Sequence, residues 1–357
     1  MPANWMVFQS LCRIMGGRDS HAPGDCIAAG LMPRLIAVAT SQDVLPALAV
    51  RCYEDPGLAG TIDEASDQQL RAALLVNTRR NMQIVVQSIQ LIRALNRAGI
   101  KPLMLKGTAQ LLTVNRENPG FRKQADIDLI VPPEAVLAAG EALQAQGYAF
   151  YRNKRLFEAP PGVPADTQAA LRISTAHHHL PPLVKNDHIA YVELHRHFLP
   201  RRFQHRNPLA PLFDSASEHQ LQDACFLVPS TEYQVIHLVL GKLVHDGYLA
   251  RRDFPLREAC DYLDLLDNAG GDFDSRLVAK HCGRALSIFD QLVTALMTEQ
   301  PTRVAAGTTD ISRRLGMMRT RYDFPTRAKL LDLYARGEHL AYSLLYSPSK
   351  LAAYISR

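Results

Sequence analysis

Hydrophobic residues recur at helical spacing over one long stretch of the chain, residues 66–98. Leucine, isoleucine, valine and methionine repeat there about every three to four residues, which is the period of an amphipathic helix. Gly99 follows directly, and glycine commonly ends a helix. Shorter apolar groups over residues 33–59 predict one or two further helices. We therefore expect a helical N-terminal segment over residues 33–99, preceded by a loose leader over residues 1–32.

After residue 99 the apolar runs become short, and several of them alternate with polar residues as a half-buried strand does. The predicted strands cover residues 100–105, 126–131, 148–152, 176–184 and 189–195. The last two flank the turn-like sequence Lys185-Asn186-Asp187, which indicates a hairpin. Helices are predicted between the earlier strands, over residues 108–113 and 134–146. A Pro- and Gly-rich loop is predicted over residues 153–175.

Beyond residue 198 the pattern becomes helical again, and no further strand is predicted. The predicted helices cover residues 232–245, 255–266, 276–297 and 327–346. The expected fold class is therefore α+β. A core with a small mixed β-sheet occupies residues 100–200, and a helical C-terminal domain occupies residues 201–357.

Two acidic residues stand on one predicted strand. Asp126 and Asp128 are two apart, so alternation places both carboxylates on one face of the strand, with Ile127 and Leu129 on the other. Neighbouring acids repel each other, and a fold that keeps both usually supplies a cation. Carboxylates together with substrate phosphates are typical ligands of Mg²⁺. The pair indicates metal-assisted phosphoryl or nucleotidyl transfer, although a solvated strand edge would have the same sequence.

A later strand offers a third acid. In residues 189–195, alternation places Tyr191, Glu193 and His195 on one face. If this strand neighbours the aspartate strand, Glu193 joins the two aspartates, and three acids at one edge suit a one- or two-metal site. The alternative is an exposed hairpin face on which Glu193 pairs with Arg196.

Positive and small residues precede the acids. Lys106 and Gly107 lie where the first predicted strand meets a helix, and Thr108 follows. Glycine lets a backbone approach a phosphate closely, and lysine adds a mobile positive charge. Arg122, in the loop before the aspartates, is a second candidate for binding phosphate. The alternative for Lys106 is that it caps the sheet edge, and the alternative for Arg122 is that it is a solvated loop residue.

Histidines gather near the third acid, at positions 177, 178, 179, 188, 195 and 197. No cysteine accompanies them and their spacing matches no common zinc pattern, so we do not expect a zinc site. We expect His195, on the face of Glu193, to hydrogen-bond that carboxylate or a phosphate. His179 is a weaker candidate for the same cleft.

The composition of the chain limits the binding partners and the cellular compartment that we expect. The 357 residues carry a net charge of +5, which suits a nucleotide but is too weak to argue for duplex nucleic acid. The six cysteines form no C-x-x-C pair, which favours a reduced, cytoplasmic protein. No apolar run approaches the length of a membrane helix, and the first residues lack the layout of a signal peptide. We therefore expect no membrane association.

The order of motifs carries a family resemblance. PLMLKGTAQLL, RKQADIDLIV, a helix ending in QGY, and YVELH together resemble the uncharacterised nucleotidyltransferase family of the DNA polymerase β-type nucleotidyltransferase superfamily. HLVLGKLVHDGY and PLREACDYLDLL resemble its helical C-terminal half, so the similarity spans roughly residues 33–267. The resemblance implies that Asp126 and Asp128 are the first two metal ligands and Glu193 the third. It places Gly107 in the superfamily's Gly-Ser position, with Thr108 in place of serine.

The resemblance implies a reaction as well. A nucleoside monophosphate would pass from an NTP, expected to be ATP, to a small-molecule, peptide or protein acceptor, with Mg²⁺ or Mn²⁺ as cofactor and pyrophosphate as product. Two alternatives stay open from the sequence. One is a non-catalytic module that binds a nucleotide or a partner protein, and the other is a kinase-like phosphotransferase. An enzyme of either kind requires Glu193 to converge with the two aspartates.

Overall fold

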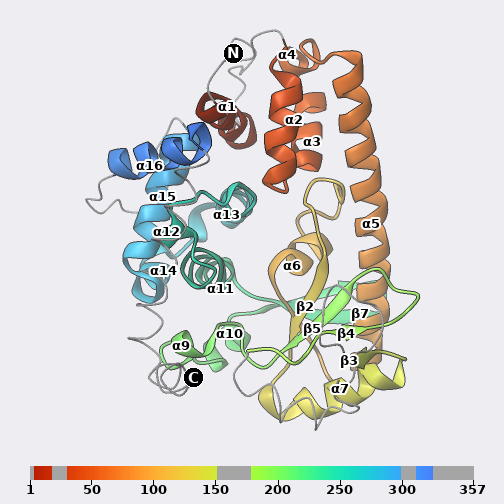
Figure 1. The fold of residues 1–357 in the computed structure, drawn as a ribbon. Coiled ribbons are helices and arrows are strands. Elements are labelled where there is room, and N and C mark those ends of the chain that lie inside the picture. The colour runs from red at the N-terminus through yellow and green to blue at the C-terminus, as the bar shows by residue number, and fades with distance from the viewer. Residues whose placement is uncertain (1–3, 18–29, 151–177, 299–310, 325–357) are drawn as a thin grey trace, which may run out of the picture. The chain divides into compact units, whose positions relative to one another are not determined.

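The computed structural model describes residues 4–17, 30–150, 178–298 and 311–324 (Figure 1). The predicted loop at 153–175, the predicted helix at 327–346 and His177 lie outside these ranges. The chain divides into two compact units. One is the continuous segment 74–237, and the other combines residues 1–73 with residues 238–357.

The continuous unit contains a mixed sheet, seven-stranded in the described part of the chain, with the order β3-β4-β5-β2-β1-β7-β6. The strands are β1 (Leu103–Met104), β2 (Asp126–Ile130), β3 (Ala149–Phe150), β4 (Leu183–Val184), β5 (Tyr191–His195), β6 (Ser217–Leu221) and β7 (Ala224–Val228). β2 pairs parallel to β5 and antiparallel to β1. The sheet together with its helices confirms the α+β class.

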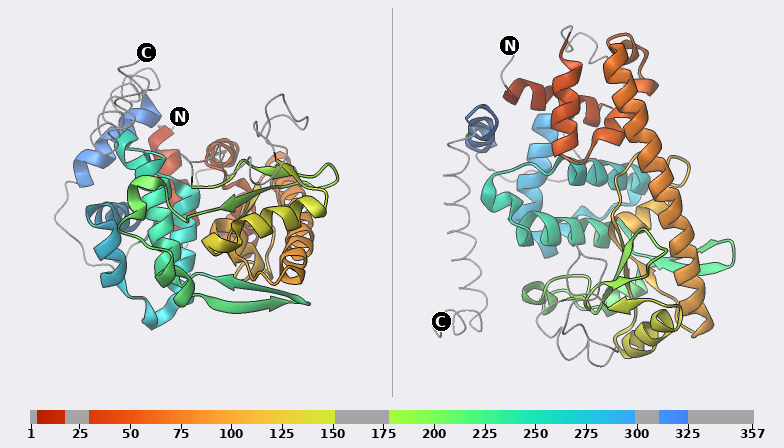
Figure 2. Two further views of the ribbon diagram at one scale, coloured as in Figure 1. Left: turned by 90° about the horizontal axis from the view of Figure 1, so that it is seen from below. Right: turned by 45° about the vertical axis from the view of Figure 1, so that its right-hand side comes forward.

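The β6–β7 hairpin corrects the prediction that no strand follows residue 198. It turns at Gln222 and Asp223, with Gln222 at φ +57°, and β7 pairs parallel to β1. β7 is a short, mostly apolar run, as a strand inside a sheet often is. β6 lies at the edge of the sheet, is largely exposed and reads SEHQL, so it lacks the apolar alternation that marks a strand. The hairpin projects as an arm (Figure 2).

Helix α5 (Glu64–Arg97) confirms the long predicted helix, and its C-terminal half packs on the sheet. Its apolar residues do not all face the core, because Met82 and Val86 are 51% and 53% exposed. Polar Asn77 and Asn81 are buried instead. The other helices beside the strands are α6 (Lys106–Leu112), the 3₁₀ turn η2 (Pro133–Ala135), α7 (Val136–Ala145), α9 (Arg201–Gln204), α10 (Ala210–Asp214) and α11 (Thr231–His237).

In the other unit, residues 4–16 form helix α1 (Asn4–Gly16), where the sequence pattern had suggested a loose leader. Trp5, Phe8 and Leu11 recur every three residues and are buried, a helical pattern that is short and interrupted by polar residues. Phe8 stacks on Tyr322, with ring centroids 4.2 Å apart. The division of the chain at residues 33, 100 and 201 stays a prediction.

The remaining helices of this unit are α2 (Met32–Ser41), α3 (Leu45–Glu54), α4 (Pro56–Ala59), the π-helix η3 (Leu238–His245), α12 (Tyr248–Arg251), α13 (Leu256–Ala269), the 3₁₀ turn η4 (Gly270–Asp272), α14 (Ser275–Cys282), α15 (Arg284–Met297) and α16 (Ile311–Asp323). The single helix predicted over residues 276–297 is two helices, because the chain turns at Gly283 with φ +54°. Among the helices of the described ranges, none is long and apolar enough to cross a membrane.

Candidate active site

Strands β2 and β5 lie side by side and bring the candidate acids together. Their parallel register pairs Asp126 with Tyr191, Asp128 with Glu193, and Ile130 with His195. Partners in register point to the same side of a sheet, so the Asp128 and Glu193 carboxyl groups are neighbours. The sequence argument required these strands to be adjacent, and they are.

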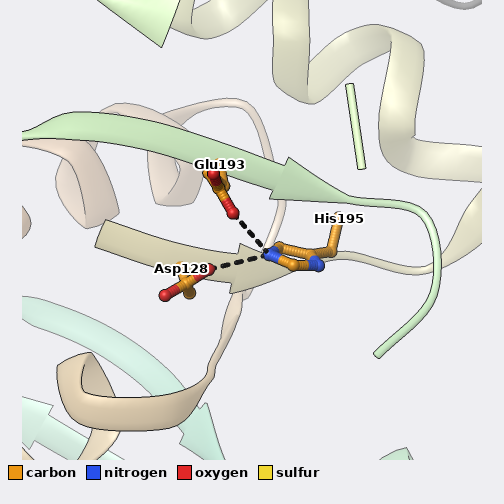
Figure 3. A group of neighbouring side chains, drawn as sticks. All are labelled: Asp128, Glu193 and His195. Atoms are coloured by element: carbon orange, nitrogen blue, oxygen red, sulfur yellow. Dashed lines mark hydrogen bonds and ion pairs between the residues drawn. The ribbon is translucent and has the colours of Figure 1, made fainter. Parts of the chain in front are cut away.

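A compact charged cluster surrounds this pair. Oδ1 of Asp128 accepts hydrogen bonds from Nζ of Lys106 at 2.6 Å and from Nε2 of His195 at 2.9 Å. The same two nitrogens lie 3.8 and 3.7 Å from Oε2 of Glu193. The Asp128, Glu193 and His195 side chains are 1%, 4% and 0% exposed, whereas Lys106 is 25% exposed. Figure 3 shows the imidazole facing both carboxylates.

Burial and charge shift the proton affinities of this cluster. Burial raises the pKa of Asp128, Lys106 lowers it, and Glu193 raises it again, so that the net direction is upward. Burial alone would lower the pKa of Lys106, but the surrounding acids outweigh burial and raise it. Burial, with Lys106 adding to it, holds the pKa of His195 well below its usual value. At neutral pH Lys106 is therefore charged and His195 neutral.

The donor set fits a divalent cation. One possible ligand atom from each of Asp128, Glu193 and His195 lies within 4.8 Å of the others. Oδ2 of Asp128 is buried and has no hydrogen-bond partner among the described residues. A buried carboxylate oxygen without a partner is costly, and a cation would satisfy it. Carboxylates suit Mg²⁺ and Mn²⁺, and an imidazole ligand would favour a transition metal.

Asp126 lies outside this group of three. It is half-buried at the start of β2, and its Oδ2 accepts a hydrogen bond from the Tyr191 hydroxyl at 3.2 Å. Its charge nevertheless acts on Lys106 and on Tyr191. The sequence grouped Asp126 with Asp128 and Glu193 and predicted that His195 hydrogen-bonds Glu193 or a phosphate. In the structure His195 hydrogen-bonds Asp128 and completes the compact group.

Lys106 and Thr108 are held to strand β2. Lys106 opens α6 with φ +53°, a left-handed conformation that costs a non-glycine residue about 1 kcal/mol or more. Thr108 is fully buried, and its Oγ1 accepts hydrogen bonds from the Asp128 amide at 3.1 Å and from Nε2 of Gln124 at 3.3 Å. The Thr108 hydroxyl thus fixes the strand at the position of Asp128, and a phosphate-binding role for it stays a prediction.

Gly107 provides room for two side chains. A Cβ atom there would collide with the guanidinium of Arg122 and the carboxamide of Gln124. Nη1 of Arg122 donates to Oε1 of Gln124 at 2.5 Å. Arg122, a candidate chosen from the sequence, therefore lies directly against α6 at Gly107, the residue that follows Lys106.

Helix α5 holds the loop that carries Arg122. Nδ2 of Asn77 donates to the carbonyl of Gly120 at 2.7 Å, and Nδ2 of Asn81 donates to the carbonyl of Arg122 at 2.7 Å. Nε of Arg80 donates to the carbonyl of Gln124 at 3.0 Å. The sequence argument missed this support. The sequence feature that indicates this support is the pair Asn77 and Asn81. They are four residues apart and share a helix face with the apolar residues that follow.

The histidines form no separate metal group among the residues described. The His178, His179 and His195 rings lie 5.0 to 5.4 Å apart between centroids. His179 uses its Nδ1 to donate to the carbonyl of Leu180 at 2.7 Å, and His188 contacts Asp187. Of the histidines in the described ranges, only His195 belongs to the group that could hold a metal ion.

Comparison with models of known protein families identifies the family of this chain. A family model described as "uncharacterised nucleotidyltransferase" matches residues 31–297, most of the chain. The matched region includes the whole sheet and every residue of the candidate site. A search of curated proteins found no match.

Proposed function

This chain belongs to the uncharacterised nucleotidyltransferase family, and from that premise we propose that it is a metal-dependent enzyme. It transfers a nucleoside monophosphate from an NTP, expected to be ATP, to a small-molecule, peptide or protein acceptor and releases pyrophosphate. In the transfer, the bond between an acceptor oxygen and the α-phosphorus forms as the bond to pyrophosphate breaks. The acceptor proton leaves to a nearby base.

One observation supports this proposal most strongly. Asp128 and Glu193 are adjacent in register on parallel strands, are almost completely buried, and share the nitrogens of Lys106 and His195. Burying acids this closely is costly, and sites that bind a cation or perform catalysis are where such clusters are kept.

The residues have separate roles in this proposal. Asp126, Asp128 and Glu193 hold Mg²⁺ or Mn²⁺, with His195 hydrogen-bonded to Asp128. A divalent ion supplies charge neutralisation for the triphosphate and lowers the pKa of an acceptor hydroxyl. Lys106 and Arg122 add positive charge for the phosphates, and Gly107 and Thr108 shape the strand-to-helix junction that would receive them.

The decisive experiment follows the label from the NTP. The purified protein is incubated with Mg²⁺ or Mn²⁺, a cell extract as the acceptor source, and ATP labelled at either the α- or the γ-phosphate. We expect α-label in the acceptor, and we expect Asp128→Asn to reduce it by about a hundredfold. Asp187→Asn is the matched control, because Asp187 is an acid of the same unit that is 70% exposed.

Three results would count against this function. Labelling from the γ-phosphate alone would indicate a kinase-like phosphotransferase. Equal α-labelling by Asp128→Asn and wild type would remove Asp128 from the mechanism. Nucleotide binding without transfer of either label would favour the non-catalytic module.

A further inference from the structure

Lys106 lies between two carboxylates in the way that a metal ion does. Its Nζ is 2.6 Å from Oδ1 of Asp128 on β2 and 3.8 Å from Oε2 of Glu193 on β5. In two-metal sites, ions roughly 4 Å apart share carboxylate ligands. The ammonium group of Lys106 therefore lies between two carboxylates, as one of the two ions in a two-metal site does.

The other oxygen of the same carboxyl group is differently placed. Oδ2 of Asp128 is buried and has no hydrogen-bond partner among the residues that the structure describes. Oδ1 receives both Lys106 and His195. One side of Asp128 is thus satisfied by the protein's own cation, and the other side is left for a cation from solution.

The charges of the cluster agree with one such cation. Asp126, Asp128 and Glu193 carry three negative charges when ionised, and all three act on Lys106. The single positive charge of Lys106 leaves an excess of two negative charges, which one divalent ion balances. With Lys106 present, a second divalent ion would leave the nucleotide-free site with two excess positive charges, whereas without Lys106 two ions would leave an excess of only one.

The backbone that carries Lys106 is held in place at the start of α6. Its backbone has φ +53° at the first residue of α6, and Thr108 ties the same turn to the amide of Asp128. A side chain that starts from such a fixed backbone is a pre-organised partner for the two carboxylates.

We propose that Lys106 is a built-in cation that takes one of two cation positions, so that the nucleotide-free protein binds a single divalent metal ion, on the Oδ2 side of Asp128. This inference rests on the proposed function, because it concerns the ion that the transfer requires. Lys106 is then a positioning residue that holds the Asp128 and Glu193 carboxylates where a second ion would otherwise hold them.

The test counts Mn²⁺ ions on the full-length protein without nucleotide, by calorimetric titration and by the electron paramagnetic resonance signal of free Mn²⁺. We expect one ion on the wild type and two on Lys106→Met, which removes the charge and keeps the length of the side chain. Lys106→Arg retains a cation and should bind one ion. Lys101→Met, at an exposed lysine that pairs with Glu218 on the surface, should also bind one.

Two Mn²⁺ ions on the wild type would overturn the inference, as would a wild type that binds none. A single ion on Lys106→Met, whatever its affinity, would overturn it too, and a tighter one would show that Lys106 and the metal compete for one position. If Lys106→Met does not fold, Lys106→Gln takes its place, with the same expected count of two ions. The label-transfer assay is independent of these counts. If the wild type transfers α-label but binds two ions without nucleotide, only this inference is contradicted. If it binds a single ion without nucleotide but transfers no label, only the proposed function is contradicted.

Discussion

Gly107 leaves space for two other side chains because it has no side chain of its own. Arg122 and Gln124 fill the place where a Cβ would lie, and Gln124 donates to the carbonyl of Asp126 at 2.5 Å. The sequence argument assigned Gly107 to the close approach of a phosphate. In the structure this glycine leaves room for the Arg122 and Gln124 side chains, which come from the loop just before β2. A role of Gly107 in binding phosphate stays a prediction.

We expect Gly107→Ala to destabilise the protein by about 1 to 2 kcal/mol, because the added methyl group displaces Gln124 and breaks its buried hydrogen bonds. The free energy of unfolding in urea measures the loss. Gly271→Ala is the control, since Gly271 is exposed and its added Cβ meets nothing within 4 Å. Equal stability of the two variants would show that Gln124 can move without cost.

The candidate residues differ in how far the sequence could predict them. Strand alternation places Asp128 on the same face as Asp126, and Glu193 on the same face as Tyr191 and His195. The family resemblance suggests that the two strands are neighbours, so Asp128 and Glu193 could both be proposed as site residues in advance. The pairing of Lys106 with Asp128 could not. It depends on the left-handed turn at Lys106 and on where β1 sits beside β2, and neither follows from local spacing.

At the scale of elements, helix α5 supports the site through side-chain amides. Gln87 donates to the carbonyl of Ala190 and accepts from its amide, at 2.7 and 3.1 Å. Asn96 does the same with Cys225, at 2.9 and 2.8 Å. Together with Asn77 and Asn81, these amides bind backbone groups of strand β7, of the residue just before β5, and of the loop before β2. The helix thereby holds the backbone on which the site residues stand.

Asn81→Asp should lower both stability and transfer activity. An aspartate cannot donate to the carbonyls of Pro119 and Arg122, which lie 2.5 and 2.7 Å from Nδ2 of Asn81, and it repels them. We expect a loss of about 2 kcal/mol or more in urea unfolding. Gln83→Glu adds the same charge on the exposed face of the same helix and should leave both unchanged. Equal effects of the two variants would mean that charge alone is responsible.

The elements themselves were predictable where periodicity was strong. The long helix and the two acid-bearing strands follow from spacings of 3.6 and 2 residues. β6 was not predictable, because an exposed edge strand has no apolar face to pattern. The buried amides of α5 were also missed, because a polar residue on an otherwise apolar helix gives no indication of which carbonyl it will bind.

At the scale of the whole molecule, every candidate site residue belongs to the continuous unit, residues 74–237. The other unit is assembled from the two ends of the chain, through contacts such as the stacking of Phe8 on Tyr322. Local patterns could not predict that assembly, because it joins segments that are separated in the chain by the whole of residues 74–237.

Metal binding should therefore stabilise the two units unequally. At about a hundred times its dissociation constant, Mn²⁺ stabilises the state that binds it by about 2.7 kcal/mol. Hydrogen–deuterium exchange followed by mass spectrometry should show slower exchange in β2 and β5, and unchanged exchange in α14 and α15. Asp128→Asn should abolish the difference. Slowing spread evenly over both units would show that they unfold as one cooperative block.

The position of β1 in the sheet has a consequence for how the protein is made. Leu103 pairs with Ile130 on one side and with Leu227 on the other. A ribosome adds roughly 5 to 20 residues per second, so for several seconds after residue 130 emerges, β1 has no partner on its second edge. An apolar strand with an open edge invites pairing with other chains. Nascent chains that stop before β7 are thus the ones for which a chaperone should matter most.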